Sequence, residues 1–338
     1  MTPAKLWLQF FTAGFAVIVA MLIVTLNTPI PYGDLSRIGM LSDHEFGWQK
    51  DQPQVDRAYL RGSPINEADV LVIGDSFSAT SRWQSVLKQH GYRFATVFWS
   101  EFHESLCDDF DDWLDRAGFK GKLVVIESVE RLLADRLANT QKCKAMTGNV
   151  AGSRIEPFFE PIVKVPGFAL NWNAKLTSGY VTYRNTRAAK EAEGPTVPVN
   201  QSWVRPVPDG CSLFSNRLCD KALFFKDDDD NGELTVQHVE QMRAFSEAHR
   251  SRSILWMVIP NKTTTYVMPD HSKDFVTAFA NAGLGPDLFT FAKEQKSKIQ
   301  DFYFPNDTHL SMHGQLALGD LMLGAIRKII PQPPAKPS

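Results

Sequence analysis

The sequence predicts an α/β protein: a three-layer α/β/α sandwich with a parallel sheet, preceded by one N-terminal transmembrane helix. From residue 69 onward, short apolar runs rich in β-branched residues alternate with helical stretches. Strands buried on both faces have this continuous apolar character, and their alternation with helices implies parallel pairing through right-handed crossovers. An uncharged run of 21 residues, Leu6 to Leu26, precedes them. These observations define the fold class.

The composition is that of a folded protein without a strong charge. The chain has 338 residues, of which 43% are hydrophobic and 22% charged, and 36 Lys+Arg against 38 Asp+Glu give a net charge of −2. A chain of this length and apolar content buries a core, which excludes whole-chain disorder. No dense run of Lys or Arg is present, so nucleic acid is not an expected partner.

The N-terminal apolar run is predicted to be a membrane anchor over residues 6–27, with residues 1–5 in the cytoplasm. At about 1.5 Å per residue it spans roughly 30 Å, the thickness of the hydrocarbon core. A cleaved signal peptide is the alternative, although its apolar region is about 7–15 residues. Lys5 on the short N-terminal side favours placing the rest of the chain across the membrane. We therefore expect a single-pass inner-membrane protein whose remaining residues lie in the periplasm.

Four cysteines bear on the compartment. Cys211 and Cys219 bracket a short segment, and Cys107 and Cys143 complete an even count. Two disulfides would fit an oxidising compartment, with Cys211–Cys219 favoured by its short loop. A zinc site and plain buried thiols are the alternatives, although no close Cys-x-x-Cys pair is present.

The rest of the chain divides by composition. Residues 28–66 are expected to form a tether and residues 67–330 the catalytic domain. Within that domain, residues 140–235 are an irregular insertion, either carrying substrate contacts or acting as a lid. The proline-rich tail, 331–338, is expected to be disordered. Four strands are predicted at 70–73, 95–98, 123–126 and 254–259, and helices at 81–90, 106–117, 236–249 and 315–330.

Two segments far apart in the sequence carry candidate catalytic residues. Ser76 follows the first strand in Gly-Asp-Ser, at the edge of the sheet where active sites of such folds lie. Asp307 and His309 precede the last helix, and residues i and i+2 of an extended segment face the same way. We predict that Ser76 is the nucleophile, His309 its base and Asp307 the group that orients the imidazole. Taken singly, the serine turn is an ordinary helix cap and His309 a structural histidine, with His313 as a rival base.

These segments resemble the SGNH/GDSL hydrolase superfamily and, more narrowly, the SGNH-like polysaccharide O-acetyltransferases of the alginate AlgJ/AlgX kind. The matching segments are 74–77, 125–131, 258–266 and 303–309. Here Ser76 precedes the Asp-x-His segment, as in ordinary SGNH enzymes, and no Gly-x-Asn-Asp block is present.

The resemblance implies an O-acetyltransferase that acts on a bacterial cell-surface or exported polysaccharide through a serine acyl-enzyme. It implies a multi-spanning membrane acyltransferase as the partner that supplies the acyl group, and no cofactor. It also implies that Arg131, Lys262 and Tyr266 bind substrate, the alternative being salt bridges and caps at strand ends. A carbohydrate esterase and a non-catalytic glycan-binding scaffold are the other hypotheses.

An acidic run, Asp227 to Asp230, is followed by Asn231 and Gly232 and has oxygen ligands at the spacing of a calcium loop. Position twelve is His238 instead of glutamate. An acidic solvated loop that caps the following helix is the favoured interpretation, and no metal is assigned.

Overall fold

The computed structural model describes residues 2–28, 30–146, 155–157, 170–172, 174–196 and 201–331. The chain forms two compact units, each assembled from separated segments. The first contains the described residues of 1–51, 164–226 and 303–308, and the second those of 52–163, 227–302 and 309–338.

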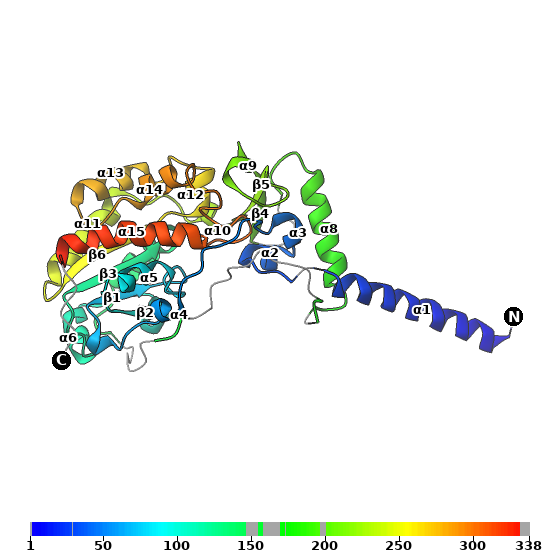
Figure 1. Cartoon of the computed structure of the whole chain (residues 1–338), viewed down its shortest axis with the longest axis horizontal. Helices are drawn as coiled ribbons and strands as arrows, with labels where there is room; N and C mark the ends of the chain where they lie inside the picture. Colours follow the sequence, from blue (N-terminus) through cyan, green and yellow to red (C-terminus); the bar gives the residue numbers. More distant parts are fainter. Residues whose placement is uncertain are drawn as a thin grey trace. The chain divides into compact units, whose positions relative to one another are not determined.

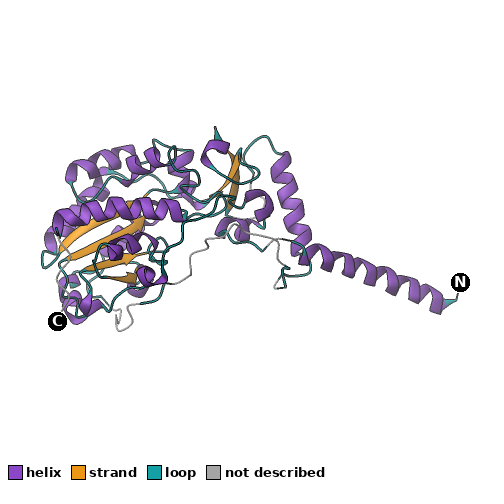
Figure 2. Cartoon of the chain, in the orientation of Figure 1, coloured by secondary structure: helices purple, strands orange, loops and turns teal. Residues whose placement is uncertain are grey.

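The second unit contains a four-stranded parallel sheet of order β2-β1-β3-β6 (Figure 2). Its strands are β1 (Val70–Gly74), β2 (Phe94–Phe98), β3 (Leu123–Val129) and β6 (Ser253–Ile259). All residues of β1 and β3 are buried, so side chains on either face of these central strands are covered. The prediction of an α/β fold with a parallel sheet is confirmed, and all four strands lie where the apolar runs predict them.

The helices of this unit lie before, between and after the strands along the chain. They are α4 (Arg57–Leu60), η1 (Ile65–Glu67), α5 (Arg82–Gln89), η2 (Trp99–Phe102), α6 (Phe110–Arg116), α7 (Glu130–Thr140), α10 (Asp227–Asp230), α11 (Val236–Ala248), α12 (Lys262–Tyr266), α13 (Lys273–Ala282), α14 (Leu288–Gln295) and α15 (Met312–Ile329). Helices α5 and α15 lie side by side (Figure 1). A Cβ at Gly319 of α15 would lie 2.6 Å from the carbonyl oxygen of Trp83, so only glycine permits this approach.

One hydrophobic cluster joins the sheet to part of these helices. Alternate residues of the central strands, such as Ile73 and Ile126, pack there with Phe110 and Trp113 of α6 and Phe245 of α11. The side-chain period of two in a strand directs these residues to one face. The cluster fixes the strands whose carboxyl ends carry the candidate site.

The first unit has a smaller core. Its elements are α1 (Pro3–Leu26), α2 (Asp34–Gly39), α3 (Asp43–Phe46), α8 (Ser178–Glu191), β4 (Ser202–Pro206), α9 (Gly210–Leu213) and β5 (Lys221–Phe225). Strands β4 and β5 pair antiparallel. Leu35, Phe46 and Leu223 are fully buried in its core cluster, which includes residues from α2, α3, α8 and the strand pair.

Helix α1 is long and apolar enough to cross a membrane. It begins three residues before the predicted span and carries large apolar side chains in the open: Trp7 is 73% and Phe10 72% exposed. A core helix of a soluble protein buries such side chains.

The structure differs from the expected division of the chain in two places. The segment expected as a tether, 28–66, contributes α2 and α3, with Leu35 and Phe46 buried at the core of the first unit. The expected insertion, 140–235, supplies α8 and the β4–β5 pair to the same unit. The apolar residues of these two segments are buried against each other. The sequence of either segment taken alone does not predict this burial. The predicted disordered tail lies outside the described residues, apart from Pro331.

Candidate active site

Ser76 lies in the turn that leaves the carboxyl end of β1. Strand β1 ends at Gly74, and residues 76–80 form a turn before α5 begins at Arg82. Ser76 is therefore not at a helix N-terminus, as the sequence suggested, because Ser81, with a φ of 54°, separates the turn from α5. The side chain of Ser76 is exposed. The first strand thus presents its serine to solvent at the predicted edge of the sheet.

His309 meets Ser76 across 233 positions of sequence. Its Nε2 lies 2.7 Å from the Ser76 Oγ, and its ring centroid is 4.8 Å from that of Phe77, which is buried. In the tautomer whose Nε2 carries no proton, the Ser76 hydroxyl donates to it. Of the two histidines predicted as candidate bases, His309 is the one joined to the serine, and His313 lies in the first turn of α15.

Asp307, the predicted orienting group, belongs to the segment that packs in the first unit. Its Oδ2 accepts a hydrogen bond of 3.0 Å from the backbone N–H of Asp34. Asp34 in turn accepts from Thr308, whose backbone N–H lies 2.8 Å from the Asp34 Oδ1. Its role toward the imidazole stays a prediction.

Asp75 holds the serine turn in place through the hydrogen bonds that its carboxylate accepts. One carboxylate oxygen accepts from the backbone N–H of Phe77, and the other accepts from Val129 N–H and from Arg136 Nη1 at 3.0 and 2.9 Å. Burial alone would raise the pKa of Asp75, but the charge of Arg136 and these donated hydrogen bonds hold it below its usual value. Asp75 is therefore a buried anion that ties the turn to the ends of β3 and α7.

A second acid, Glu127 of β3, lies beside Asp75 with no exposed surface. Its Oε2 accepts from the backbone N–H of Asp75 at 2.8 Å and from the hydroxyl of Ser78 at 2.9 Å. Burial, and then the negative charge of Asp75, raise the pKa of Glu127 well above its usual value. A Cβ at Gly74 would lie 2.7 Å from the same Oε2, which explains the glycine of Gly-Asp-Ser.

Arg136 compensates the charge at this site. Its side chain, 3% exposed, also bonds Glu104 at 2.9 Å and Ser128 at 2.8 Å, and its guanidinium stacks on Trp99 at 4.8 Å. A guanidinium held by this many hydrogen-bonding and stacking partners has a fixed orientation. It fixes Asp75, and through Asp75 the turn that carries Ser76.

A pocket of about 350 Å³ opens at Ser76, and its lining includes Ser76, Trp99, Ser100, Leu132 and Arg136. Volumes of this order hold small ligands. Among the described residues, no acceptor is bonded to the backbone N–H of Ser76, whereas Asp75 occupies the amides of residues 77–79. The Ser76 amide is thus the candidate donor to an oxyanion formed at this serine.

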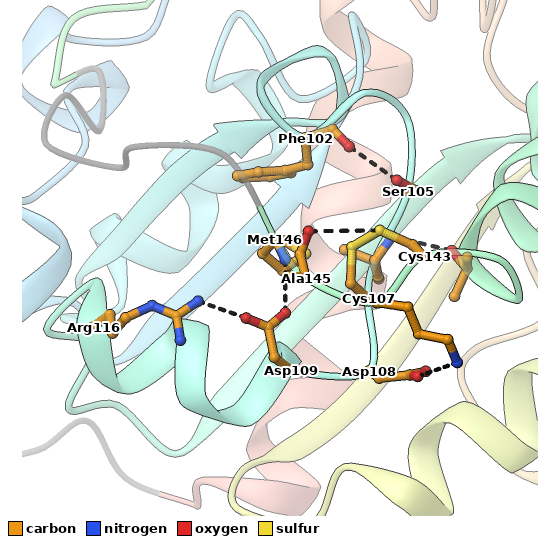
Figure 3. The surroundings of a disulfide bond; sticks show 12 residues. Phe102, Ser105, Cys107, Asp108, Asp109, Arg116, Cys143, Ala145 and Met146 are labelled. Carbon is orange, nitrogen blue, oxygen red and sulfur yellow. Dashed lines mark hydrogen bonds and ion pairs between the residues drawn. A yellow bond between two sulfur atoms is a disulfide. The ribbon is translucent and has the colours of Figure 1, made fainter.

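A disulfide connects the segments that follow η2 and α7, two helices that contribute residues to the pocket lining. Cys107 and Cys143 are bonded, which joins the loop after η2 to the segment after α7 (Figure 3). Asp109 strengthens the junction by accepting from Met146 N–H at 2.7 Å and from Arg116 at 2.7 Å. Cys211 and Cys219 form the second disulfide, so both predicted pairs are present and the zinc alternative is wrong.

The three predicted substrate-binding residues do not line this pocket. Arg131 bonds Asp228 at 3.2 Å and the side-chain oxygen of Asn261 at 3.4 Å, and Lys262 and Tyr266 are 1% and 7% exposed. They belong to a buried polar cluster at the carboxyl ends of β3 and β6. This placement matches the alternative of salt bridges at strand ends, and a substrate role for them stays a prediction.

The acidic run forms the short helix α10. Asp228 is buried and accepts from Arg131 and from Thr263 at 3.0 Å. His238 is in the capping box of α11, where its Nδ1 accepts from the backbone N–H of Thr235 at 2.8 Å. The run is therefore a short helix with one buried aspartate instead of a loop, and the cap of the next helix is Thr235.

Sequence reasoning missed the residues beneath the serine. Glu127 and Arg136 had no predicted role, and Asp75 was expected only as a cap. A signal for Glu127 is present, because an acid within the apolar run Leu123–Val129 requires a partner when buried. Arg136 has no comparable signal, because its position in α7 gives no indication of burial.

No family model matches the chain, and no curated protein or solved structure is detectably similar to it.

Proposed function

We propose that this protein is a membrane-tethered serine O-acetyltransferase with a three-layer SGNH-like catalytic domain, which acetylates hydroxyls of a cell-surface or exported polysaccharide. The observation that carries the proposal is the 2.7 Å contact between Ser76 Oγ and His309 Nε2 at the mouth of a pocket. A serine hydroxyl is a weak nucleophile until a base takes its proton. Here the base is within hydrogen-bonding distance.

The reaction has two halves, and in each of them His309 takes one proton and gives it back. In the first half His309 takes the hydroxyl proton while Ser76 Oγ bonds to the acyl carbon; the bond between the acyl carbon and the donor's leaving group then breaks, and the leaving group receives the proton from His309. The Ser76 amide stabilises the oxyanion, and Asp307 keeps its predicted orienting role. In the second half, a sugar hydroxyl gives its proton to His309 and bonds to the acyl carbon. The bond between Ser76 Oγ and the acyl carbon breaks, and Oγ takes the proton back from His309.

The rest of the chain supports the location. Exposed apolar side chains along α1 suit a helix in lipid, and two disulfides suit an oxidising compartment such as the periplasm. We propose that α1 anchors the protein in the inner membrane with both units on the periplasmic side. A multi-spanning membrane acyltransferase is the proposed partner that delivers the acetyl group.

The test uses the full chain in detergent with a chromogenic acetyl ester. The parent is expected to release the chromophore and to carry an acetyl adduct on Ser76 by mass spectrometry, and Ser76→Ala is expected to lose both. His309→Ala should lose activity, and His313→Ala serves as the matched control that keeps it. If the parent and Ser76→Ala behave alike, the scaffold hypothesis replaces ours.

Added oligosaccharide separates transfer from hydrolysis. Acetylated oligosaccharide formed faster than acetate supports the transferase. Acetate alone, at a rate independent of the oligosaccharide, identifies a carbohydrate esterase.

A further inference from the structure

Large exposed aromatic side chains gather in one part of the first unit. Outside α1, only Trp172, Tyr180 and Tyr183 among the described large hydrophobic residues are more than half exposed, at 73%, 57% and 59%. Leu170 and Leu176 are exposed beside them in the sequence. We call these five residues the aromatic collar. Such a concentration on a water-soluble surface marks an interaction site.

The collar is fixed to the last turn of α1. The backbone N–H of Asn171 donates to the carbonyl of Leu26 at 3.0 Å, and the Thr25 hydroxyl donates to the carbonyl of Leu176 at 2.7 Å. A Cβ at Gly179 would lie 2.6 Å from the Thr25 Cα, so α8 starts in close contact with α1. Helix α8 then runs across the axis of α1 (Figure 1). A helix placed in this way lies along the surface of a bilayer that α1 crosses.

The dimensions put the collar at the bilayer boundary. The 24 residues of α1 span about 36 Å, and the hydrocarbon core is about 30 Å thick. The last turn of α1, with Thr25, therefore reaches the headgroup region. Trp and Tyr are the residues that concentrate there, because their rings are apolar and their N–H and O–H groups find polar partners.

The charges nearby also suit a lipid surface. Among the described residues, the side-chain cations of Lys175 and Arg184 have no acidic partner and are exposed. Arg187 and Lys190, which line a groove of about 570 Å³ beside α1, are already paired with Glu191 and Glu45. The groove is therefore a poor anion site, whereas Lys175 and Arg184, which lie among and beside the collar residues in the sequence, carry free positive charge. Anionic headgroups attract such charges.

We propose that the aromatic collar docks on the headgroup surface of the bilayer and holds the first unit against the membrane. The inference rests on the proposed anchoring by α1, but not on the acyl-transfer chemistry. The occupant is the lipid surface, because the collar continues directly from a bilayer-length helix. A second copy of the chain is the competing occupant, which the experiment below distinguishes.

The test measures tryptophan quenching in the full chain reconstituted into vesicles of phosphatidylcholine and phosphatidylglycerol. The lipids carry bromine either near the headgroup or near the chain ends. The difference between parent and Trp172→Phe isolates Trp172, which is expected to be quenched about twofold more strongly by the shallow bromine. In the Trp172→Phe background, Tyr180→Trp should give the same preference, so the result does not depend on one variant. Arg217→Trp, exposed on the loop before β5, is the unquenched reference in the same unit.

The outcomes separate the proposals. Trp7, isolated by Trp7→Phe, reports insertion of α1: if it is quenched and both collar probes are not, docking is overturned and anchoring stands. If neither Trp7 nor the collar probes are quenched, anchoring and docking both fall. A Trp172 emission shifted to the blue without quenching identifies a protein partner, such as a second copy, and overturns lipid docking. If the probes are quenched as expected but the parent cleaves no ester and carries no acetyl adduct on Ser76, the acyltransferase is refuted and docking stands.

Discussion

Replacing Glu127 by glutamine should make the protein more stable than the parent as the pH rises. In the fold, Glu127 has a raised pKa because it is fully buried next to the anionic Asp75. In the unfolded chain its pKa is near 4.5. A raised carboxyl contributes stability that is fully present below the unfolded pKa and is lost as the pH rises through the folded pKa. Glutamine, an uncharged isostere, keeps an oxygen acceptor for Asp75 N–H and the Ser78 hydroxyl and has no proton to lose.

The size of the effect follows from one proton. Between pH 4.5 and the folded pKa of Glu127, the parent loses up to about 1.4 kcal/mol per pH unit relative to Glu127→Gln. For a unit of this size, that is about 3–6 °C in melting temperature per pH unit. Asp75 has the opposite sign, because its lowered pKa gives stability present above 3.8 and lost as the pH falls through the folded pKa. Its window lies below that of Glu127.

The assay is thermal melting of the full chain in detergent, followed by tryptophan fluorescence at several pH values between about 5 and 8. Other groups titrate in both proteins, so the difference between parent and variant isolates Glu127. Glu193→Gln, at an exposed position, is the control and should stay within about 0.5 kcal/mol of the parent. A difference between Glu127→Gln and parent that is constant across this pH range would refute a protonated Glu127 beneath the serine.

Three further perturbations test the same region. Arg136→Met should cost about 3–5 kcal/mol in unfolding free energy, because it leaves Asp75 as an unpaired buried charge, and Arg136→Lys should recover part of the loss in a denaturation series. Gly74→Ala should abolish ester cleavage while the chain remains membrane-bound, because the added Cβ would displace the serine turn; unchanged cleavage would contradict the packing described. Serine at both Cys107 and Cys143 should cost roughly 4 kcal/mol by loop entropy for a separation of 36 residues, and an unchanged melting temperature would show that the bond does not brace the fold.

The strands were predictable from the sequence and most of the surrounding assembly was not. A buried parallel strand is apolar throughout, so Val70–Gly74 and Ser253–Ile259 are visible as continuous runs in the local sequence. The first unit has no such local signature. Its core joins Leu35 to Val204 and Leu223, which lie more than 160 positions further along the chain, and their shared burial appears only after folding. Composition marked these segments as tether and insertion because both contain proline and polar residues in irregular order and neither has a periodic apolar pattern.

The same distinction applies to the site. The pairing of Ser76 with His309 was predictable, because both lie beside the ends of recognisable elements and their chemistry is complementary. The roles of Asp75 and Arg136 were not predictable. The sequence around Asp75 is the same whether its carboxylate caps a helix or binds Arg136. Only the fold places Val129 and Arg136 on its carboxylate.

The two acids beneath the serine are most effective in opposite protonation states. Asp75 must be ionised to hold Arg136 and the backbone of β3, and a second anion at Glu127 would repel it in a site with little water. Glu127 nevertheless has to accept two hydrogen bonds, from Asp75 N–H and Ser78, and a neutral carboxyl does so at lower electrostatic cost. Neutrality also matters to the proposed chemistry, because an oxyanion forming at Ser76 is disfavoured by each negative charge below it. A proton held by Glu127 would thus connect the stability of the turn to the proposed acyl transfer.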